Sequence, residues 1–257
     1  MRTIMPKTKT KPSSYLLQTS QYYQFKNFLE RGAVACFSNR NLDLGFGSAQ
    51  IEENRKAFLN TLGINYENLA CAQQPHGAGV AVVRERDRGK GAKSFVSAIP
   101  DCDALVTNCK NVPLAVFTAD CLSIFLLAKD KKSAAIIHAG WRGSKESVVI
   151  NTVESMRKNF GAQPRDLLVG FGPAIRSCCY EVKSEFKDYF DSGLIERNGK
   201  LYLDLVEINR AQLKKTGIAT QNLFDCGFCT ACLKDEFFSF RKEAQAAGRI
   251  MSLIMLK

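Results

Sequence analysis

The chain has 257 residues, of which 46% are hydrophobic, 24% are charged and 10% are aromatic, and its formal net charge is +11. These values are typical of a folded globular protein and exclude the disordered, collagen-like and fibrous classes. The sequence contains two histidines and ten cysteines. A chain this long and apolar needs no disulfide scaffold, so the cysteines indicate thiols in a reducing compartment, and we expect a cytoplasmic protein.

Residues 1–24 are predicted to form a basic N-terminal tail, and residues 25–257 a single catalytic domain. Residues 1–14 lack the apolar segment of a signal peptide. The longest apolar run, 112–128, contains Pro113 and Asp120 and is therefore not expected to span a membrane. The basic stretches interleave no aromatic residues, which argues against nucleic-acid binding and leaves an anionic small substrate as an alternative.

The first half of the chain mixes one helix with several short strands. A helix is expected over 48–63, with Ser48 as its N-cap and Gly63 as its stop. Residues 69–83 combine strand-like pieces with a loop at 73–77, and a charged loop follows at 84–93. Buried strands are predicted over 112–117, 123–128 and 133–137.

In the second half, apolar residues recur at helical spacing after Ser144, which predicts a helix capped by Ser144 and ended by Gly161. The remaining expected elements are strands over 167–172, 237–240 and 250–256 and helices near 184–190 and 206–215. Strands follow strands as often as they follow helices, so strict βαβ alternation fails. The pattern favours an α+β domain with mixed sheets.

The candidate catalytic residues lie where apolar segments break. His76 and His138 each enter a glycine-containing loop, and Cys121 follows Asp120 between two buried strands. An aspartate in such a region is costly unless it is paired or lines a cleft. Two sites remain open: a metal held by His76, Cys121 and His138 with one position left for water, or a Cys121 nucleophile activated by His138. Each histidine alone also fits a hydrogen-bonded structural role.

A second candidate is an anion pocket at the predicted helix start. Arg142 precedes Ser144, and unpaired backbone N–H groups beside a guanidinium favour phosphate. A plain capped helix with Arg142 in an ion pair is the alternative.

The cysteines outside this region show only a partial ligand pattern. Cys226, Cys229 and Cys232 have metal-like spacing, but no further cysteine pair or histidine follows to complete four ligands. The adjacent Cys178 and Cys179 are expected to pack rather than to chelate one ion.

Taken together, these segments resemble the purine nucleoside phosphorylase family with a laccase domain, which is YfiH-like and was formerly described as multicopper polyphenol oxidoreductase. The most specific motifs are TADC at 118–121 and HAGWRG at 138–143. The other matching segments, in chain order, are 41–45, 53–55, 74–77, 103–107, 172–175, 178–182, 229–230, 237–241 and 248–249. Two departures are Pro75, where the family usually has valine, and a shortened stretch at 38–41.

The resemblance implies one α+β domain with mixed sheets layered between helices, and a metal, usually taken as zinc, on His76, Cys121 and His138. It also implies phosphorolysis of adenosine, inosine and methylthioadenosine, with adenosine deaminase activity. The expected partners are therefore purine nucleosides and phosphate, with neither nucleic acid nor membrane. Two histidines cannot supply the many imidazoles of a multicopper oxidase, so zinc is favoured over copper.

Each reaction assigns a role to a candidate residue. In deamination, water activated at the metal would attack purine C6 while Asp120 moves protons. In phosphorolysis, phosphate near Arg142 and Ser144 would attack the anomeric carbon. The competing hypotheses are a copper-dependent polyphenol oxidase, a metal-independent hydrolase using Cys121 and His138, and a binding module without catalysis.

Overall fold

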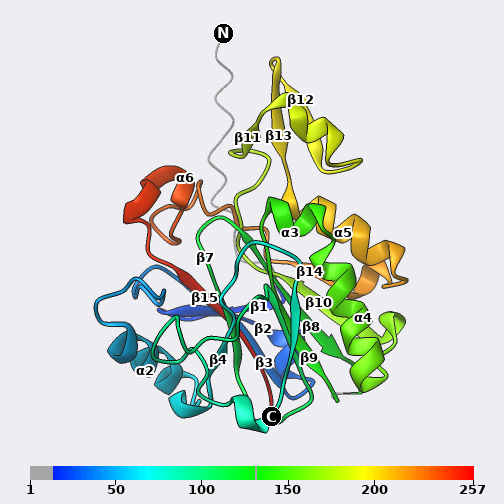
Figure 1. Ribbon diagram of the computed structural model, residues 1–257. Helices are drawn as coiled ribbons and strands as arrows, with labels where there is room; N and C mark the ends of the chain where they lie inside the picture. The colour runs from blue at the N-terminus through cyan, green and yellow to red at the C-terminus, as the bar shows by residue number, and fades with distance from the viewer. Residues whose placement is uncertain (1–13, 131) are drawn as a thin grey trace.

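The computed structural model describes residues 14–130 and 132–257, and two six-stranded sheets form its centre (Figure 1). The first sheet has the order β1-β2-β3-β15-β7-β4. Its strands are β1 (Leu16–Gln18), β2 (Tyr22–Phe25), β3 (Ala33–Ser38), β15 (Ile250–Leu256), β7 (Leu114–Thr118) and β4 (Ala70–Cys71). The β4–β7 pair is parallel and the other pairs are antiparallel.

The second sheet has the order β14-β10-β8-β9-β6-β5. Its strands are β14 (Leu223–Asp225), β10 (Leu167–Phe171), β8 (Leu122–Ala128), β9 (Ala134–Ala139), β6 (Ala104–Thr107) and β5 (Val80–Val83). The two outer pairs, β10–β14 and β5–β6, are parallel, and the inner pairs are antiparallel. Both sheets are therefore mixed, as the sequence predicted.

A small third sheet, of order β11-β13-β12, projects from the body at the top of Figure 1. Its strands are β11 (Glu181–Val182), β13 (Lys200–Leu203) and β12 (Leu194–Arg197). The α-helices are α1 (Lys26–Leu29), α2 (Ile51–Thr61), α3 (Trp141–Lys145), α4 (Val148–Phe160), α5 (Leu205–Lys215) and α6 (Phe240–Glu243). Short 3-10 helices cover Tyr66–Asn68, Glu85–Asp87, Pro164–Asp166, Ser184–Asp188, Thr220–Asn222 and Ala244–Ala246.

The two large sheets pack face to face, with helices on both outer faces. Successive side chains of a strand point to opposite faces, so Phe37 of β3 enters the central core while Cys36 packs under α2. Phe25 of the first sheet meets Phe125 of the second at a ring-centroid distance of 5.5 Å. Helices α4 and α5 cover the outer face of the second sheet with side chains such as Met156. This layered single-domain α+β fold confirms the predicted class.

Several local predictions differ from the structure. Ser144 lies inside α3 rather than at an N-cap, and the expected helix is broken at Ser147, which has a φ of 61°. Gly161 ends α4 with a φ of 70°, as predicted. Residues 237–240 form no strand because the backbone there turns into α6.

The domain and helix α2 also begin at other residues than the sequence predicted. Residues 16–18 and 22–25 pair within the first sheet, so the described part of the predicted 1–24 tail belongs to the domain. Residues 1–13 of that tail lie outside the described residues. Helix α2 begins at Ile51 behind Gln50, with Ser48 accepting a hydrogen bond from the Gln50 N–H at 3.3 Å. Among the described residues, no helix has the length and apolar character needed to cross a membrane.

Candidate metal centre and active site

His76, Cys121 and His138 come together from three parts of the chain. His76 lies in the loop between β4 and β5, Cys121 on the turn between β7 and β8, and His138 on β9. One ligand atom from each lies within 4.8 Å of the other two. The two imidazole rings are 4.8 Å apart between centroids and nearly perpendicular, at 87°. The structure therefore brings together the three residues that the sequence singled out.

The loop that carries His76 is held in an unusual backbone conformation. Gln74 and His76 have φ values of 61° and 68°, in a region that non-glycine residues rarely adopt. The Gln74 side chain donates to the Phe117 carbonyl and accepts from the Phe117 N–H, both at 2.8 Å. This pair of bonds fastens the loop to β7, so the position of His76 depends on the first sheet.

A buried carboxylate, Asp103, orders the ligands from behind. Its Oδ1 accepts from Nδ1 of His138 at 2.6 Å and from the backbone N–H of His76 at 3.0 Å, and its Oδ2 accepts from the Gly77 N–H at 2.7 Å. A carboxylate on one ring nitrogen fixes the histidine tautomer and leaves the other nitrogen for a metal. Sequence reasoning assigned Asp103 no role, although an aspartate directly before the apolar strand β6 was a usable signal.

The local charges favour an ionised sulfur. Burial opposes a thiolate at Cys121, but the charge of His138 and hydrogen bonds from His138 and His76 outweigh it and lower the pKa of Cys121 to about 6. Burial likewise opposes the charged form of His138, while Cys121 and the hydrogen bond to Asp103 raise the pKa of His138 to about 9. This pair therefore suits a nucleophile or a metal ligand.

Gly140 leaves the space that the ligands occupy. A Cβ atom at Gly140 would lie 3.0 Å from Sγ of Cys121 and 3.6 Å from Cδ2 of His76. Its backbone is extended, with φ of −75° and ψ of 178°, so conformation alone does not demand glycine here. The requirement comes from the close approach of the ligand side chains.

The three residues open onto a cavity of about 850 Å³. This is within the size range of small-molecule sites. Aromatic side chains supply much of its wall: Phe46, Phe95, Phe117, Tyr180 and Phe240. Its lining also includes polar and charged residues: Asp43, Gln73, Gln74, Asp120, Arg241 and Arg249.

Asp120 stands beside Cys121 at the cavity wall, with both carboxylate oxygens engaged. Oδ1 accepts from the Thr230 hydroxyl at 2.6 Å, and Oδ2 accepts from the backbone N–H of Arg241 at 2.6 Å. The residue is 8% exposed and has a φ of 88°. Asp120 thus ties the C-terminal loops to the turn that carries Cys121, which explains how an aspartate is tolerated between two buried strands.

Arg142 and Ser144 both lie on α3. Ser144 is fully buried, and its hydroxyl accepts from the Asn209 amide at 2.8 Å. Arg142 is exposed and stacks over Trp141, with its guanidinium carbon 4.6 Å from the ring centroid. Neither residue lines the cavity. Ser144 therefore points into the core under α5, and the phosphate role expected for Arg142 and Ser144 stays a prediction.

The residues at the floor of the cavity fit a catalytic zinc centre in donor type and support. Two imidazoles and one thiolate are ligands that zinc prefers, and a catalytic site keeps one position open. Asp103 supplies the carboxylate that commonly backs a ligating histidine.

Comparison with known proteins gives consistent relatives. The family model described as "Multi-copper polyphenol oxidoreductase laccase" matches residues 30–257. "Purine nucleoside phosphorylase YlmD" from Geobacillus stearothermophilus is 33% identical over 225 residues, which cover 84% of this chain and 82% of the relative. "Adenosine deaminase RL5", from an unknown prokaryotic organism, is 30% identical over 223 residues, covering 83% of this chain and 85% of the relative.

The fold agrees with these relatives. The crystal structure of YlmD from Geobacillus stearothermophilus superimposes with a TM-score of 0.90 at 29% identity, covering 95% of this chain and 99% of that one. The crystal structure of a Bacillus licheniformis hypothetical protein, YfiH, also gives a TM-score of 0.90, at 26% identity. The chain therefore belongs to the multi-copper polyphenol oxidoreductase laccase family, whose relatives include proteins named purine nucleoside phosphorylase.

Proposed function

We propose that the protein is a zinc-dependent purine nucleoside enzyme. Its reactions are phosphorolysis of adenosine, inosine and methylthioadenosine to the free base and (methylthio)ribose 1-phosphate, and deamination of adenosine. The observation that carries this proposal is the convergence of His76, Cys121 and His138 on one cavity of about 850 Å³. The names of the relatives, purine nucleoside phosphorylase and adenosine deaminase, support the substrate class. The cytoplasmic location stays a prediction.

His76, Cys121 and His138 would hold the ion, and Asp103 would orient His138 toward it. When bound, zinc supplies a Lewis acid that activates water or polarises a substrate oxygen. The aromatic wall would stack against the purine and exclude water, with Phe46 and Phe117 packed edge to face at 5.0 Å. Two imidazoles suffice for this site, whereas a multicopper oxidase needs more than the chain contains.

Asp120, beside Cys121 in the cavity lining, would carry protons during deamination. Water adds to purine C6 and ammonia leaves, so a neighbouring group must accept one proton and return it. Each oxygen of Asp120 already accepts one hydrogen bond and keeps a lone pair for this task. The two bonds also hold the carboxylate in a single orientation beside Cys121.

Phosphorolysis needs a cation for the incoming phosphate. A phosphate oxygen bonds to C1′ of the ribose while the C1′–N9 bond breaks and the purine takes up a proton. Arg241 and Arg249 are the arginines that line the cavity, and we assign them the role that the sequence suggested for Arg142. The Arg241 guanidinium also donates to the Glu181 carbonyl at 3.3 Å, which anchors it at the cavity edge.

The test combines metal analysis with assays of adenosine and inosine, with and without phosphate. We expect bound zinc, ribose 1-phosphate formation that requires phosphate, and ammonia release from adenosine that does not. His138→Ala and Cys121→Ala are each expected to lose the zinc ion held by His76, Cys121 and His138, together with both activities, while Cys109→Ser, outside the site, retains them.

Three results would each overturn the proposal in favour of a named alternative. Activity that survives chelation but is lost on alkylation of Cys121 would indicate a hydrolase that uses Cys121 and His138. Bound copper with oxygen uptake on phenols would indicate a polyphenol oxidase. Nucleoside binding without turnover would indicate a binding module.

A further inference from the structure

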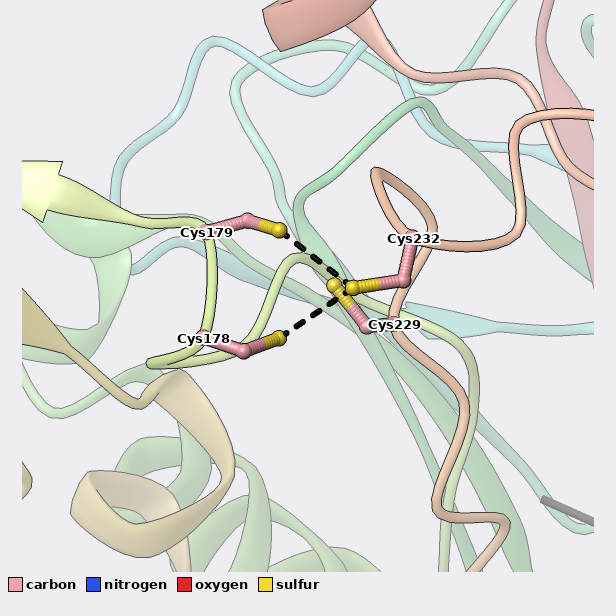
Figure 2. Close-up of side chains that lie close together, drawn as sticks. All are labelled: Cys178, Cys179, Cys229 and Cys232. Atoms are coloured by element: carbon pink, nitrogen blue, oxygen red, sulfur yellow. Dashed lines mark hydrogen bonds between the residues drawn. The ribbon is translucent and has the colours of Figure 1, made fainter. Parts of the chain in front are cut away.

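Four cysteines outside the cavity form a second cluster, shown in Figure 2. Cys178 and Cys179 lie between β10 and β11, and Cys229 and Cys232 lie in the segment that follows β14. Their sulfur atoms all lie within 4.8 Å of one another. Cys178 and Cys179 were expected to pack rather than to chelate one ion, and the structure places both of them beside Cys229 and Cys232.

The structure also explains why the sequence lacked a fourth ligand. Of the series Cys226, Cys229 and Cys232, the first is 3% exposed and packs in the core between the large sheets. The two others face Cys178 and Cys179, which are about fifty residues earlier in the chain. Two cysteines from each of two segments make a complete set.

The sulfur spacing fits a metal site better than a disulfide. Sγ of Cys232 lies 3.5 Å from Sγ of Cys178 and 3.4 Å from Sγ of Cys179. A disulfide would need about 2.05 Å. Four thiolates around a tetrahedral zinc, with bonds of about 2.3 Å, are roughly 3.8 Å apart. The observed separations are close to the second value and far from the first.

We propose that Cys178, Cys179, Cys229 and Cys232 bind one zinc ion as a closed structural site. This site shares no residue with the set formed by His76, Cys121 and His138. Each thiol that coordinates releases its proton to solvent, and no electron transfer is involved. With four protein ligands, the ion has no open position for a substrate.

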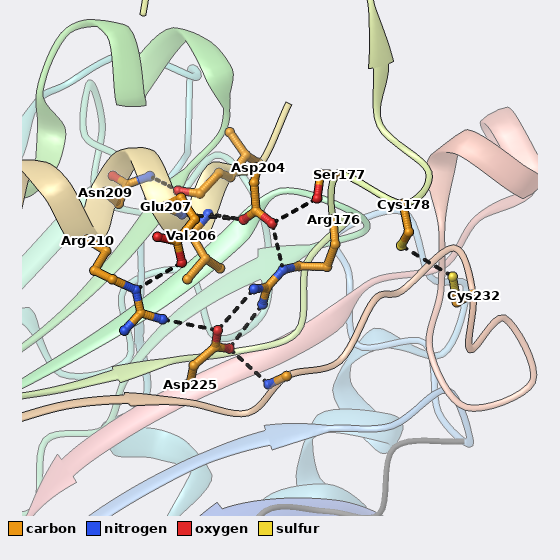
Figure 3. A network of polar contacts seen from close by, with 12 residues as sticks. Arg176, Ser177, Cys178, Asp204, Val206, Glu207, Asn209, Arg210, Asp225 and Cys232 are labelled. Atoms are coloured by element: carbon orange, nitrogen blue, oxygen red, sulfur yellow. Dashed lines mark hydrogen bonds and ion pairs between the residues drawn. The ribbon is translucent and has the colours of Figure 1, made fainter. Parts of the chain in front are cut away.

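The backbone on both sides of the cluster is held independently of any ion. Ala174 and Cys229 form a parallel β-bridge, with the Thr230 N–H donating to the Ala174 carbonyl at 3.1 Å. The Arg176 guanidinium donates to both carboxylate oxygens of Asp225 at 3.0 Å (Figure 3). These contacts join the two cysteine-bearing segments next to the sulfurs, so the ligands are brought together before a metal binds.

Simple packing does not account for this arrangement. Cys178 and Cys232 are exposed, so their sulfurs bury little apolar surface by meeting here.

The proposed ion would brace the wall of the active-site cavity. Thr230, beside Cys229, donates to Asp120 at 2.6 Å, and Tyr180, beside Cys179, lines the cavity. The Arg241 guanidinium donates to the Cys179 carbonyl at 3.4 Å. A metal that ties the two segments together therefore helps to fix Asp120, Tyr180 and Arg241, which line the cavity.

The first test counts zinc in the full-length chain, purified with a reductant that does not bind metal. We expect about two zinc ions per chain, and about one in each of Cys178→Ser, Cys232→Ser and His138→Ala. The double variant Cys178→Ser with His138→Ala is expected to hold none, and Cys109→Ser two. The cysteine variants leave His76, Cys121 and His138 unchanged. Their loss of one zinc ion therefore tests the second site whether or not the cavity acts on nucleosides.

The second test uses cobalt in place of zinc, which avoids reliance on the folding of the cysteine variants. His138→Ala loaded with cobalt is expected to show the strong near-ultraviolet charge-transfer band and the visible bands of a tetrahedral tetrathiolate site. Cys178→Ser should lose that band. The proposal is overturned if His138→Ala binds no cobalt, if both serine variants keep the wild-type zinc content, or if mass spectrometry of the purified chain finds a disulfide within the cluster.

Discussion

Replacing Asp103 by asparagine is the sharpest test of how the candidate zinc centre is built. The side chain is fully buried and accepts three hydrogen bonds, from His138, His76 and Gly77. An asparagine has nearly the same shape but only one accepting oxygen. If that oxygen takes the place of Oδ1, the bonds to His138 and His76 remain, while the amide NH₂ faces the Gly77 N–H, donor against donor.

The expected losses of stability and of zinc affinity follow from these contacts. The partly buried N–H of Gly77 loses its charged acceptor, which lowers the free energy of unfolding by about 1–3 kcal/mol. His138 also loses the negative charge behind its ring. Loss of such a partner typically weakens metal affinity by about 10–100-fold, or roughly 1.4–2.8 kcal/mol. We therefore expect Asp103→Asn to fold, to be moderately destabilised, and to bind zinc more weakly at the His138 site.

Two measurements check this prediction. Competition with a chromophoric chelator reports zinc affinity, and urea unfolding of the zinc-free chain reports stability. Asp101→Asn is the matched control, because this exposed residue undergoes the same change two positions away and makes no contact with His138. Zinc affinity in Asp103→Asn equal to that of Asp101→Asn would refute the role given to Asp103.

Three further predictions concern the cavity. Gly140→Ala should weaken zinc binding at the His138 site, because the added Cβ would meet Sγ of Cys121 at 3.0 Å. Gly47→Ala, which has open space around it, should leave zinc affinity unchanged. Equal zinc affinities of the two variants in the chelator assay would contradict this prediction. Arg241→Gln should raise the KM for phosphate by about tenfold, because a charge-assisted hydrogen bond to phosphate is lost. Arg142→Gln should leave this KM unchanged. If initial-rate assays show the larger effect for Arg142→Gln, the phosphate site lies on α3 instead. In the metal-stripped chain, alkylation of Cys121 by iodoacetamide should be fast at neutral pH and slow as pH falls through about 6, because the lowered pKa keeps the thiolate present above that value. Peptide mass spectrometry follows the alkylation of Cys121. An alkylation rate that rose only near pH 8.5, the pKa of an ordinary thiol, would show that the pKa of Cys121 is not lowered.

Local sequence patterns were sufficient for much of the fold. The apolar runs at 112–117, 123–128 and 250–256 correspond to strands β7, β8 and β15, and helical spacing with a terminal glycine located α4. These features depend on residues close together in the chain, whose periodicity and capping are visible in the sequence. The same breaks in apolar runs pointed to His76, Cys121 and His138.

Other parts of the site depend on contacts that no local pattern contains. Asp103 meets His138 because β6 and β9 pair in the second sheet, and Asp120 meets Thr230 across 110 residues. Ser144 matched an N-cap pattern, but tertiary packing against Asn209 placed it inside a helix.

The histidines and cysteines likewise separate what composition indicates from what only the tertiary structure decides. Composition alone indicated that histidine is too scarce for a multicopper centre, and it predicted that the cysteines are thiols. Only the tertiary structure decided which cysteines share a site, because Cys178 and Cys229 become neighbours through the bridge between Ala174 and Cys229. Spacing along the chain records ligands that lie on one segment, whereas a site assembled from two segments exists only once the sheets and the loops between them have packed.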